Sequence, residues 1–148
     1  MKTALVFGSS GLVGGHLVNQ LIQNDNYSKI KLFVRADPRD KNSKFEIIKT
    51  DFNNLENHKE DIKGDDCFFC IGTTKKNSPD KNEYKRIERD MPVEIAEIAK
   101  ANLINSFIYV SSGFADPKNS GAYLRYKGEV EEELKKLNFS KLGIMRPS

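Results

Sequence analysis

Two serines, a tyrosine and a lysine near the end of the chain have the types and the spacing of an acid/base centre. They lie in the segment SSGFADPKNSGAYLRYK, residues 111 to 127. Tyr123 and Lys127 are four residues apart, so on a helix they share one face. A nearby ammonium group favours phenolate and lowers a tyrosine pKa that is ordinarily about 10. Such a tyrosine can pass a proton to a carbonyl oxygen that Ser111 or Ser112 holds, while a nicotinamide supplies hydride.

The Tyr-x-x-x-Lys spacing alone is a weak signal, because Tyr27 and Lys31 match it as well. Those two residues lie where a loop enters an apolar run, outside any helical pattern and before any serine pair. From the spacing alone, a surface tyrosine beside a solvated lysine explains Tyr123 and Lys127 equally well. A strand, a serine pair, a loop, and then tyrosine and lysine on a helix form a much rarer conjunction.

A glycine-rich segment near the N-terminus, VFGSSGLVGGHL at residues 6 to 17, separates an apolar run from a helical pattern. Glycines in that place allow a tight turn, close approach of the backbone to a pyrophosphate, and close packing of helix on strand. The helix N-terminus adds free N–H groups and a positive dipole end. We therefore expect a dinucleotide to bind here, with an ordinary tight turn as the alternative. The expected contacts are Gly8, Ser9, Ser10, Gly11, Leu12, Val13 and Gly14.

Arg35 follows the next apolar run, about 20 residues after the glycine segment, where dinucleotide sites contact the adenosine ribose. An arginine suits a ribose 2′-phosphate, so the sequence favours NADP(H) over NAD(H). Arg39, Ser9 and Ser10 are further candidates for that phosphate. Asp37 keeps NAD(H) open, and a solvated charge at a strand end is the other interpretation of Arg35.

Two later segments are also expected at the cofactor. Asp51 and Phe52 are placed to flank an adenine. Gly72 and Thr73 belong to the segment CIGTT at residues 70 to 74, where the backbone can pass close to the cofactor.

Strand-length apolar runs alternate with helical patterns along the chain. The strand candidates are residues 3–7, 30–34, 67–71, 106–111 and 142–145, and the more polar run 45–49 is expected at a sheet edge. Three helical faces are Leu12, Leu17, Leu21 and Ile22; Ile87, Met91, Ile95 and Ile98; and Val130, Leu134 and Leu137. This alternation predicts an α/β fold, a doubly wound parallel sheet with helices on both faces. Pro92 is expected either to kink a helix or to lie in a first turn capped by Asp90.

The bulk composition limits the classes of function. A chain of 148 residues suits a single domain spanning 1–148, and its interspersed charges with a net charge of +3 argue against a nucleic-acid partner. No apolar run is long enough for a membrane span and no secretory signal is evident, which predicts a cytoplasmic protein.

Cys67 and Cys70 lie in a strand candidate, so buried thiols are favoured over a redox pair. His16 and His58 show no metal-ligand spacing, so we expect no metal site.

In these motifs the chain resembles the short-chain dehydrogenase/reductase superfamily, particularly its atypical branch that includes the Tat-interactive-protein-like NADPH-binding proteins. The matching segments are GSSGLVGGHL, FVR, DFNNL, CIGTT, FIYVSS, YLRYKGEVE and IMRPS, and they span essentially the whole chain. The resemblance implies a Rossmann fold that binds NADP(H). It also implies that Tyr123 donates or accepts the proton, while Lys127 binds the nicotinamide ribose and lowers the tyrosine pKa. Ser112 would orient the substrate oxygen, with Ser111 as the fallback.

We therefore expect an NADP(H)-dependent oxidoreductase acting on an unknown small carbonyl or alcohol. Family members commonly continue past this point into segments that form much of the substrate pocket, so this chain looks shortened after Pro147. That shortening favours one alternative, a non-catalytic NADP(H)-binding regulatory or scaffold protein with a protein partner. A nucleotide-sugar epimerase or dehydratase is less favoured, because such enzymes need a large C-terminal lobe. A homodimer remains open, since many relatives associate through the helices that flank the tyrosine.

Overall fold

Six parallel strands form one sheet in the order β3-β2-β1-β4-β5-β6. The computed structural model describes residues 1–73 and 76–147, so Thr74 of the CIGTT segment and the final Ser148 lie outside it. The strands are β1 (Lys2–Phe7), β2 (Tyr27–Val34), β3 (Phe45–Lys49), β4 (Asp66–Phe69), β5 (Ser106–Val110) and β6 (Lys141–Met145). The chain runs outward from β1 in both directions, which is the Rossmann arrangement and creates a crevice where the direction changes. The polar strand β3 lies at the edge, as expected.

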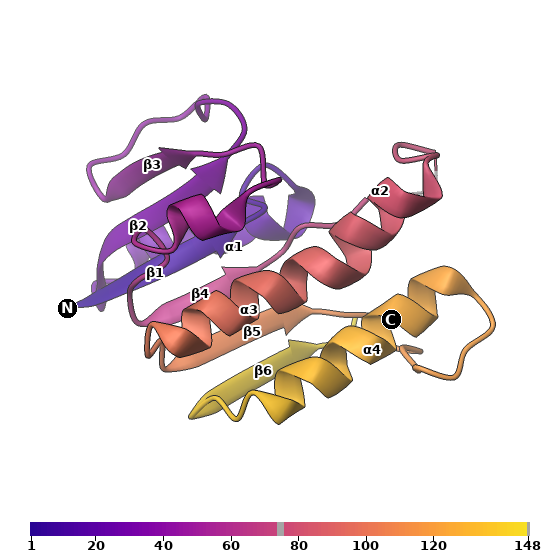
Figure 1. The fold of residues 1–148 in the computed structure, drawn as a ribbon. Coiled ribbons are helices and arrows are strands. Elements are labelled where there is room, and N and C mark those ends of the chain that lie inside the picture. Colours follow the sequence, from indigo (N-terminus) through magenta and orange to yellow (C-terminus); the bar gives the residue numbers. More distant parts are fainter. Residues whose placement is uncertain (74–75, 148) are drawn as a thin grey trace.

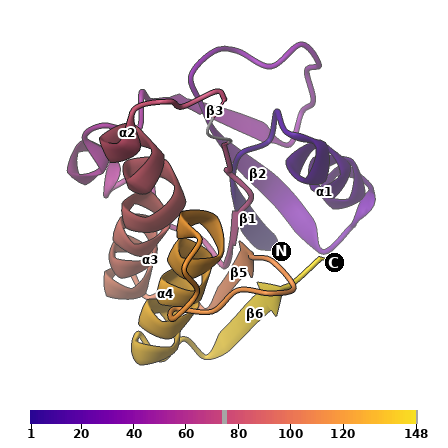
Figure 2. The same ribbon diagram turned by 90° about the vertical axis from the view of Figure 1, so that its right-hand side faces the viewer.

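Helices cover both faces of this sheet, which confirms the doubly wound prediction (Figures 1 and 2). The helix α1 (Leu12–Gln23) lies on one face, and α2 (Lys81–Lys85), α3 (Met91–Ala101) and α4 (Ala122–Lys136) lie on the other. A π-helical turn, η2 (Arg86–Asp90), joins α2 directly to α3, and a short 3₁₀ turn, η1 (Leu55–His58), follows β3. Pro92 lies in the first turn of α3, but the Asp90 side chain makes no capping hydrogen bond.

Alternation along the strands divides the apolar residues between two cores. In β1, Leu5 and Phe7 pack toward α3, whereas Ala4 and Val6 pack toward α1. This is the pattern of a parallel strand that is buried on both faces. Leu12 was expected on the buried face of α1. It is 80% exposed, because it is the first residue of the helix and follows the glycine-rich loop. In the described part of the chain, no helix has both the length and the apolar character to cross a membrane.

Candidate cofactor cleft and catalytic centre

A cleft of about 1080 Å³ opens where the chain leaves the carboxyl ends of β1, β2 and β4. We call it the cofactor cleft. The predicted cofactor contacts that line it are Gly8, Ser9, Ser10, Gly11, Leu12, Arg35, Phe52, Gly72 and Thr73, and Arg39 lines it as well. Val13, Gly14 and Asp51 do not line it, and neither does Lys127. Most of the predicted cofactor residues are thus brought together by the crevice of the sheet.

The three glycines of the first loop have different surroundings. Gly8 has φ +96°, and a Cβ atom there would lie 2.7 Å from the carbonyl carbon of Cys70. A Cβ atom on Gly14 would overlap the carbonyl oxygen of Gly8, whereas the nearest atom to one on Gly11 is 3.7 Å away. Gly8 and Gly14 are therefore required by packing, and Gly11 leaves open space facing the cleft. Among the described side chains none caps α1 at Gly11, so the helix N-terminus is available to a phosphate.

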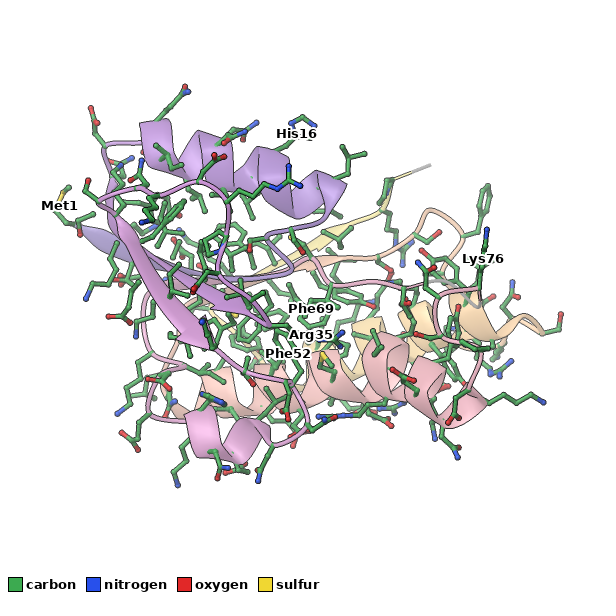
Figure 3. All side chains as sticks on the ribbon, turned by 90° about the horizontal axis from the view of Figure 1, so that it is seen from above. Met1, His16, Arg35, Phe52, Phe69 and Lys76 are labelled. Atoms are coloured by element: carbon green, nitrogen blue, oxygen red, sulfur yellow. The ribbon has the colours of Figure 1, made fainter. Side chains whose placement is uncertain are left out.

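Arg35 lines the cleft beside Phe52, with its guanidinium Cζ 5.9 Å from the centre of the Phe52 ring (Figure 3). It also lines a smaller hollow of about 500 Å³, together with Lys49, Thr50, Asp51 and His58. Arg35 therefore borders both the cofactor cleft and this smaller hollow. Asp37, the residue that kept NAD(H) open, pairs with Lys49 at 3.1 Å.

Phe52 serves mainly as packing, because it is only 5% exposed. Its backbone has φ 65°, a conformation that costs energy for a residue with a side chain. Two hydrogen bonds hold it: the Phe52 N–H donates to Thr50 Oγ1 at 3.0 Å, and Arg86 donates to the Phe52 carbonyl at 2.8 Å. This arrangement fixes the ring on which Arg35 rests.

The helix α4 carries both Tyr123 and Lys127, as their spacing predicted. Tyr123 is 40% exposed, and the Lys127 side chain beneath it is only 5% exposed. The Lys127 ammonium lies 5.6 Å from the centre of the Tyr123 ring and 5.1 Å from that of Tyr109. It also approaches the carbonyl oxygen of Val110 at 3.4 Å, at the end of β5. The two proposed reactive groups are thus adjacent, on one face of one helix.

Lys127 was expected to lower the pKa of Tyr123, but the net shift in this structure is upward. Burial raises the pKa of Tyr123, and the negative charge of Glu88 raises it further. The physical reason is that Lys127 is 3.2 Å from Glu88 Oε2, so its positive charge is already balanced. Without another change at the site, the phenol stays protonated.

The two serines differ in their surroundings. Ser111 is 3% exposed, and its hydroxyl donates to Glu131 Oε2 at 2.5 Å. Glu131 is held in turn by Arg146, whose Nε donates to it at 3.1 Å. Ser112 is half-buried, and its hydroxyl has no side-chain partner among the described residues. The structure therefore favours Ser112 over Ser111 as the serine that contacts a substrate.

Glu88 is a site residue that the sequence analysis missed. Its Oε1 accepts a hydrogen bond from the Thr73 N–H at 2.7 Å, so it contacts both the cofactor cleft and Lys127. A signal was present, because Glu88 follows Tyr84 by four residues and precedes Met91 by three. A carboxylate on such a face is unusual, since all three residues are buried.

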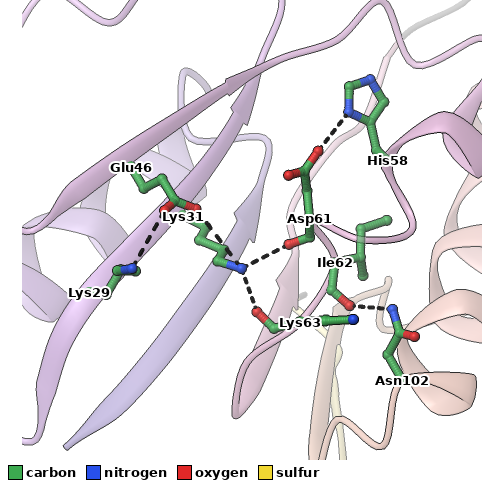
Figure 4. Close-up of polar contacts among 8 residues, drawn as sticks. All are labelled: Lys29, Lys31, Glu46, His58, Asp61, Ile62, Lys63 and Asn102. Atoms are coloured by element: carbon green, nitrogen blue, oxygen red, sulfur yellow. Dashed lines mark hydrogen bonds and ion pairs between the residues drawn. The ribbon is translucent and has the colours of Figure 1, made fainter.

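The second Tyr-x-x-x-Lys pair has a structural role. The Tyr27 hydroxyl donates to Asp66 at 2.5 Å, and Lys31 donates to the carbonyl oxygens of Asp61 and Lys63 at 3.0 and 2.9 Å. Figure 4 shows the Lys31 ammonium between these carbonyls and Glu46. Both residues are outside any helix, as the sequence indicated, but they lie within β2 and not in a loop that enters it.

The two cysteines have the character of unreactive thiols. Both are free, Cys67 is fully buried in β4, and Cys70 lies just after that strand and is partly buried. Burial raises the pKa of both thiols, that of Cys70 to about 11. This agrees with the interpretation of the CxxC spacing as packing.

Known proteins resemble the chain at two levels. The family model described as NAD(P)H-binding matches residues 8–147. Protein HTATIP2 of Rattus norvegicus is 32% identical, with 99% of this chain and 62% of that protein covered. Protein fmp52, mitochondrial, of Emericella nidulans is 30% identical, with 99% of this chain and 66% of that protein covered. The chain therefore spans less than two thirds of the length of these curated relatives.

Solved structures show the same fold at lower identity. MoeE5 in complex with UDP-glucose and NAD superposes with a TM-score of 0.78 at 18% identity, covering 97% of this chain and 53% of that one. UDP-glucuronic acid 4-epimerase from Bacillus cereus in complex with NAD superposes with a TM-score of 0.70 at 21% identity, covering 97% and 56%. At these identities the likeness concerns the fold alone.

The expectation of a cytoplasmic protein is wrong according to these relatives. The similar fungal proteins of Emericella nidulans, Candida glabrata and Coccidioides immitis are all named mitochondrial. The composition misled here, because the lack of a long apolar run does not identify the compartment in which a protein is found.

Proposed function

Because the chain belongs to the NAD(P)H-binding family and to the atypical short-chain dehydrogenases/reductases, we propose that it is an NADP(H)-dependent oxidoreductase. Its substrate would be a small carbonyl compound or alcohol. One observation carries the proposal: Lys127, buried beneath Tyr123, is joined through Glu88 to Thr73, which lines the cofactor cleft. A dinucleotide cleft and an acid/base pair are thereby connected by two short contacts.

The residues of the cleft fit a dinucleotide. Gly11 leaves space at the N-terminus of α1 for the pyrophosphate, and Gly72 and Thr73 line the same cleft. Lys127 would contact the nicotinamide ribose, as the family resemblance implies. The bound nicotinamide would supply or accept the hydride.

The side chains of the chain itself would handle the proton and the substrate oxygen. Tyr123 is exposed enough to reach a substrate, and it would donate its proton to the carbonyl oxygen in reduction. Ser112 would donate a hydrogen bond to the same oxygen. In the reverse direction Tyr123 would act as the base, and a raised pKa makes this direction dependent on high pH.

A preference for NADP(H) is supported by charge. Arg35 and Arg39 both line the cleft, and Lys49 lines the smaller hollow together with Arg35. The nearby Asp37, which would repel a 2′-phosphate, is paired with Lys49. The net field at this end would therefore attract an additional phosphate.

Nucleotide titration of the purified protein tests the cofactor part of the proposal. We expect tighter binding of NADPH than of NADH, and Arg35→Ala should weaken NADPH binding about tenfold or more while hardly changing NADH, because a hydrogen bond to a charged group is lost. Lys29→Ala is the matched control, since Lys29 is an exposed cation of β2 that pairs with Glu46. Equal affinity for both nucleotides, unaffected by Arg35→Ala, would refute the preference.

Turnover tests the catalytic part. Tyr123→Phe should keep NADPH binding and lose carbonyl reduction across a panel of small aldehydes and ketones. If the variant turns over as fast as the wild type, Tyr123 has no such role.

One observation favours the alternative of a nucleotide-binding regulatory protein. Burial and the negative charge of Glu88 leave the pKa of Tyr123 raised even with Lys127 beside it, which is unfavourable for a proton-transfer group near neutral pH. Under this alternative, NADPH would change which proteins are captured in a pull-down while no carbonyl substrate is reduced. The same captured proteins with and without NADPH would count against it.

A further inference from the structure

The Glu88 carboxylate fills the space between the cofactor cleft and the Lys127 ammonium. Its side chain is 0% exposed. Oε1 accepts the Thr73 N–H at 2.7 Å, and Oε2 faces Lys127 Nζ at 3.2 Å. Apart from that ammonium, no donor among the described residues contacts Oε2. One carboxylate therefore links a backbone group of the cleft to the lysine of the proposed catalytic set.

Stability alone is a poor explanation for this pair. Taking both charges out of water has a large desolvation cost, and an apolar replacement of a buried ion pair is often neutral or stabilising. The neighbouring buried positions Tyr84, Ile87 and Met91 show that the helix face is otherwise suited to such a replacement. The pair is better explained by what it holds in place.

The local helix geometry directs Glu88 inward. Residues 86–90 form the π-helical turn η2 within an otherwise α-helical stretch. A π-turn has more residues per turn than an α-turn, which allows Ile87 and Glu88 both to be buried. Such turns are often found at functional sites.

We propose that Glu88 is a positioning residue for Lys127 that ties the ammonium to the loop following β4, an inference that rests on the proposed function. Glu88 holds the ammonium against the end of β5, beside the Val110 carbonyl and the Tyr109 ring. Because Thr73 lines the cleft, nucleotide binding and the position of Lys127 are coupled.

The same carboxylate influences Tyr123. Four groups face this phenol or act on it electrostatically: Lys127 from α4, Glu88 from η2, Tyr84 from α2 and Tyr109 from β5. After burial, the negative charge of Glu88 is what raises the pKa of Tyr123, and the Lys127 ammonium is the positive group 5.6 Å from the Tyr123 ring. Removing the charge of Glu88 therefore lowers the pKa of Tyr123 and frees Lys127 to act on the phenol.

Glu88→Gln tests this role, because the amide oxygen can still accept the Thr73 N–H while the charge is lost. We expect NADPH affinity to fall about tenfold, because the Lys127 ammonium loses the charged contact that positions it. We also expect the pH midpoint for alcohol oxidation, which needs the phenolate, to move to lower pH. Glu129→Gln is the matched control, since Glu129 lies on α4 and pairs with Arg89 at 3.4 Å, away from Lys127. An unchanged affinity and an unchanged midpoint in Glu88→Gln would overturn the proposal.

A melting experiment covers the case in which Glu88→Gln alone folds poorly. Lys127→Met leaves the Glu88 carboxylate buried without its partner, whereas the double variant Glu88→Gln/Lys127→Met removes both charges. We expect the double variant to melt at a higher temperature than Lys127→Met, because no unpaired buried charge remains. A double variant that melts lower would overturn the pairing.

These readouts separate the two proposals. Absence of carbonyl turnover in the wild type would refute the proposed catalysis, yet NADPH affinity and melting would still decide the role of Glu88. Conversely, turnover that requires Tyr123 but is indifferent to Glu88→Gln would leave the proposed function intact and refute the positioning role.

Discussion

The hydroxyl of Ser111 and the carboxylate of Glu131 form a 2.5 Å hydrogen bond inside the fold, and Arg146 binds the same carboxylate. This network joins the end of β5 to α4 and to the segment after β6. Ser111 is therefore held in a structural hydrogen bond, whereas Ser112 lies at the surface of the site.

Alanine substitution of the two serines should therefore give opposite results. Ser112→Ala should lower kcat/KM about 10²–10³-fold, as expected for the loss of a donor to a developing oxyanion, and should leave the melting temperature unchanged. Ser111→Ala should cost about 1.5–3 kcal/mol of stability, because a buried hydrogen bond to a charged group is lost, and should leave more of the activity. Urea unfolding and steady-state kinetics on both variants measure this. The reverse pattern would assign the substrate contact to Ser111.

Two glycines of the first loop offer a second matched pair. Gly11→Ala should fold, with a stability loss of about 1 kcal/mol at this N-cap position, and should bind NADPH at least tenfold more weakly because the new methyl group enters the space for the pyrophosphate. Gly14→Ala should lose about 3 kcal/mol of stability, since its methyl group would overlap the Gly8 carbonyl. Unfolding curves and fluorescence titration distinguish the two. Full NADPH affinity in Gly11→Ala would place the phosphates elsewhere.

Most of the sheet could be predicted from the sequence because its strands are buried on both faces. Short continuous apolar runs identified β1, β4, β5 and β6, and the more polar run identified β3 as an edge strand. The start of β2 was missed by three residues. Tyr27 begins that strand by pairing with Lys2, but Ser28 and Lys29 after it are exposed and polar. The strand β2 therefore extends, through its pairing with β1, beyond the N-terminal end of the apolar run.

The candidate site was predictable where spacing alone determines geometry. Four residues on a helix bring Tyr123 and Lys127 together, and a glycine loop after a first strand forms a cleft in this topology. The electrostatic state was not predictable, because Glu88 reaches Lys127 from a different element and through a π-turn that the sequence does not reveal. Burial of Tyr123, together with the charge of Glu88, reversed the expected direction of the Tyr123 pKa.

The cysteines should behave as slow thiols. Because burial raises the pKa of Cys70 to about 11, its thiolate fraction near neutral pH is roughly a hundredfold or more below that of a free cysteine. Iodoacetamide at pH 7.5 should therefore alkylate neither Cys67 nor Cys70 in the native protein at the rate seen after unfolding in urea. Mass spectrometry over time measures both rates. Rapid native alkylation, or a Cys67–Cys70 disulfide under mild oxidation, would contradict the packing role.

A buried carboxylate at the opposite end of the sheet should control acid stability. The Asp66 side chain is 6% exposed, accepts the Tyr27 hydroxyl at 2.5 Å and lies 2.9 Å from Lys2 Nζ. Burial alone would raise its pKa, but the hydrogen bonds from Tyr27, Lys2 and Ser106 outweigh burial, so the pKa of Asp66 is lowered. A group whose pKa is lowered by folding stabilises the protein above its unfolded pKa, about 3.9, and that contribution is lost as pH falls through the folded value.

Tyr27→Phe should therefore lower the free energy of unfolding at pH 7 by about 1.5–3 kcal/mol, since a hydrogen bond to a charged group is removed. The pKa of Asp66 should rise toward its unfolded value in this variant, so less stability is lost on acidification and the acid limb should be flatter than in the wild type. Asp66→Asn should show a flatter acid limb than either protein. Urea unfolding between pH 3 and 7 measures the three curves, with Tyr126→Phe as the control tyrosine on α4. Parallel curves for wild type and Tyr27→Phe would show that this hydrogen bond does not set the titration of Asp66.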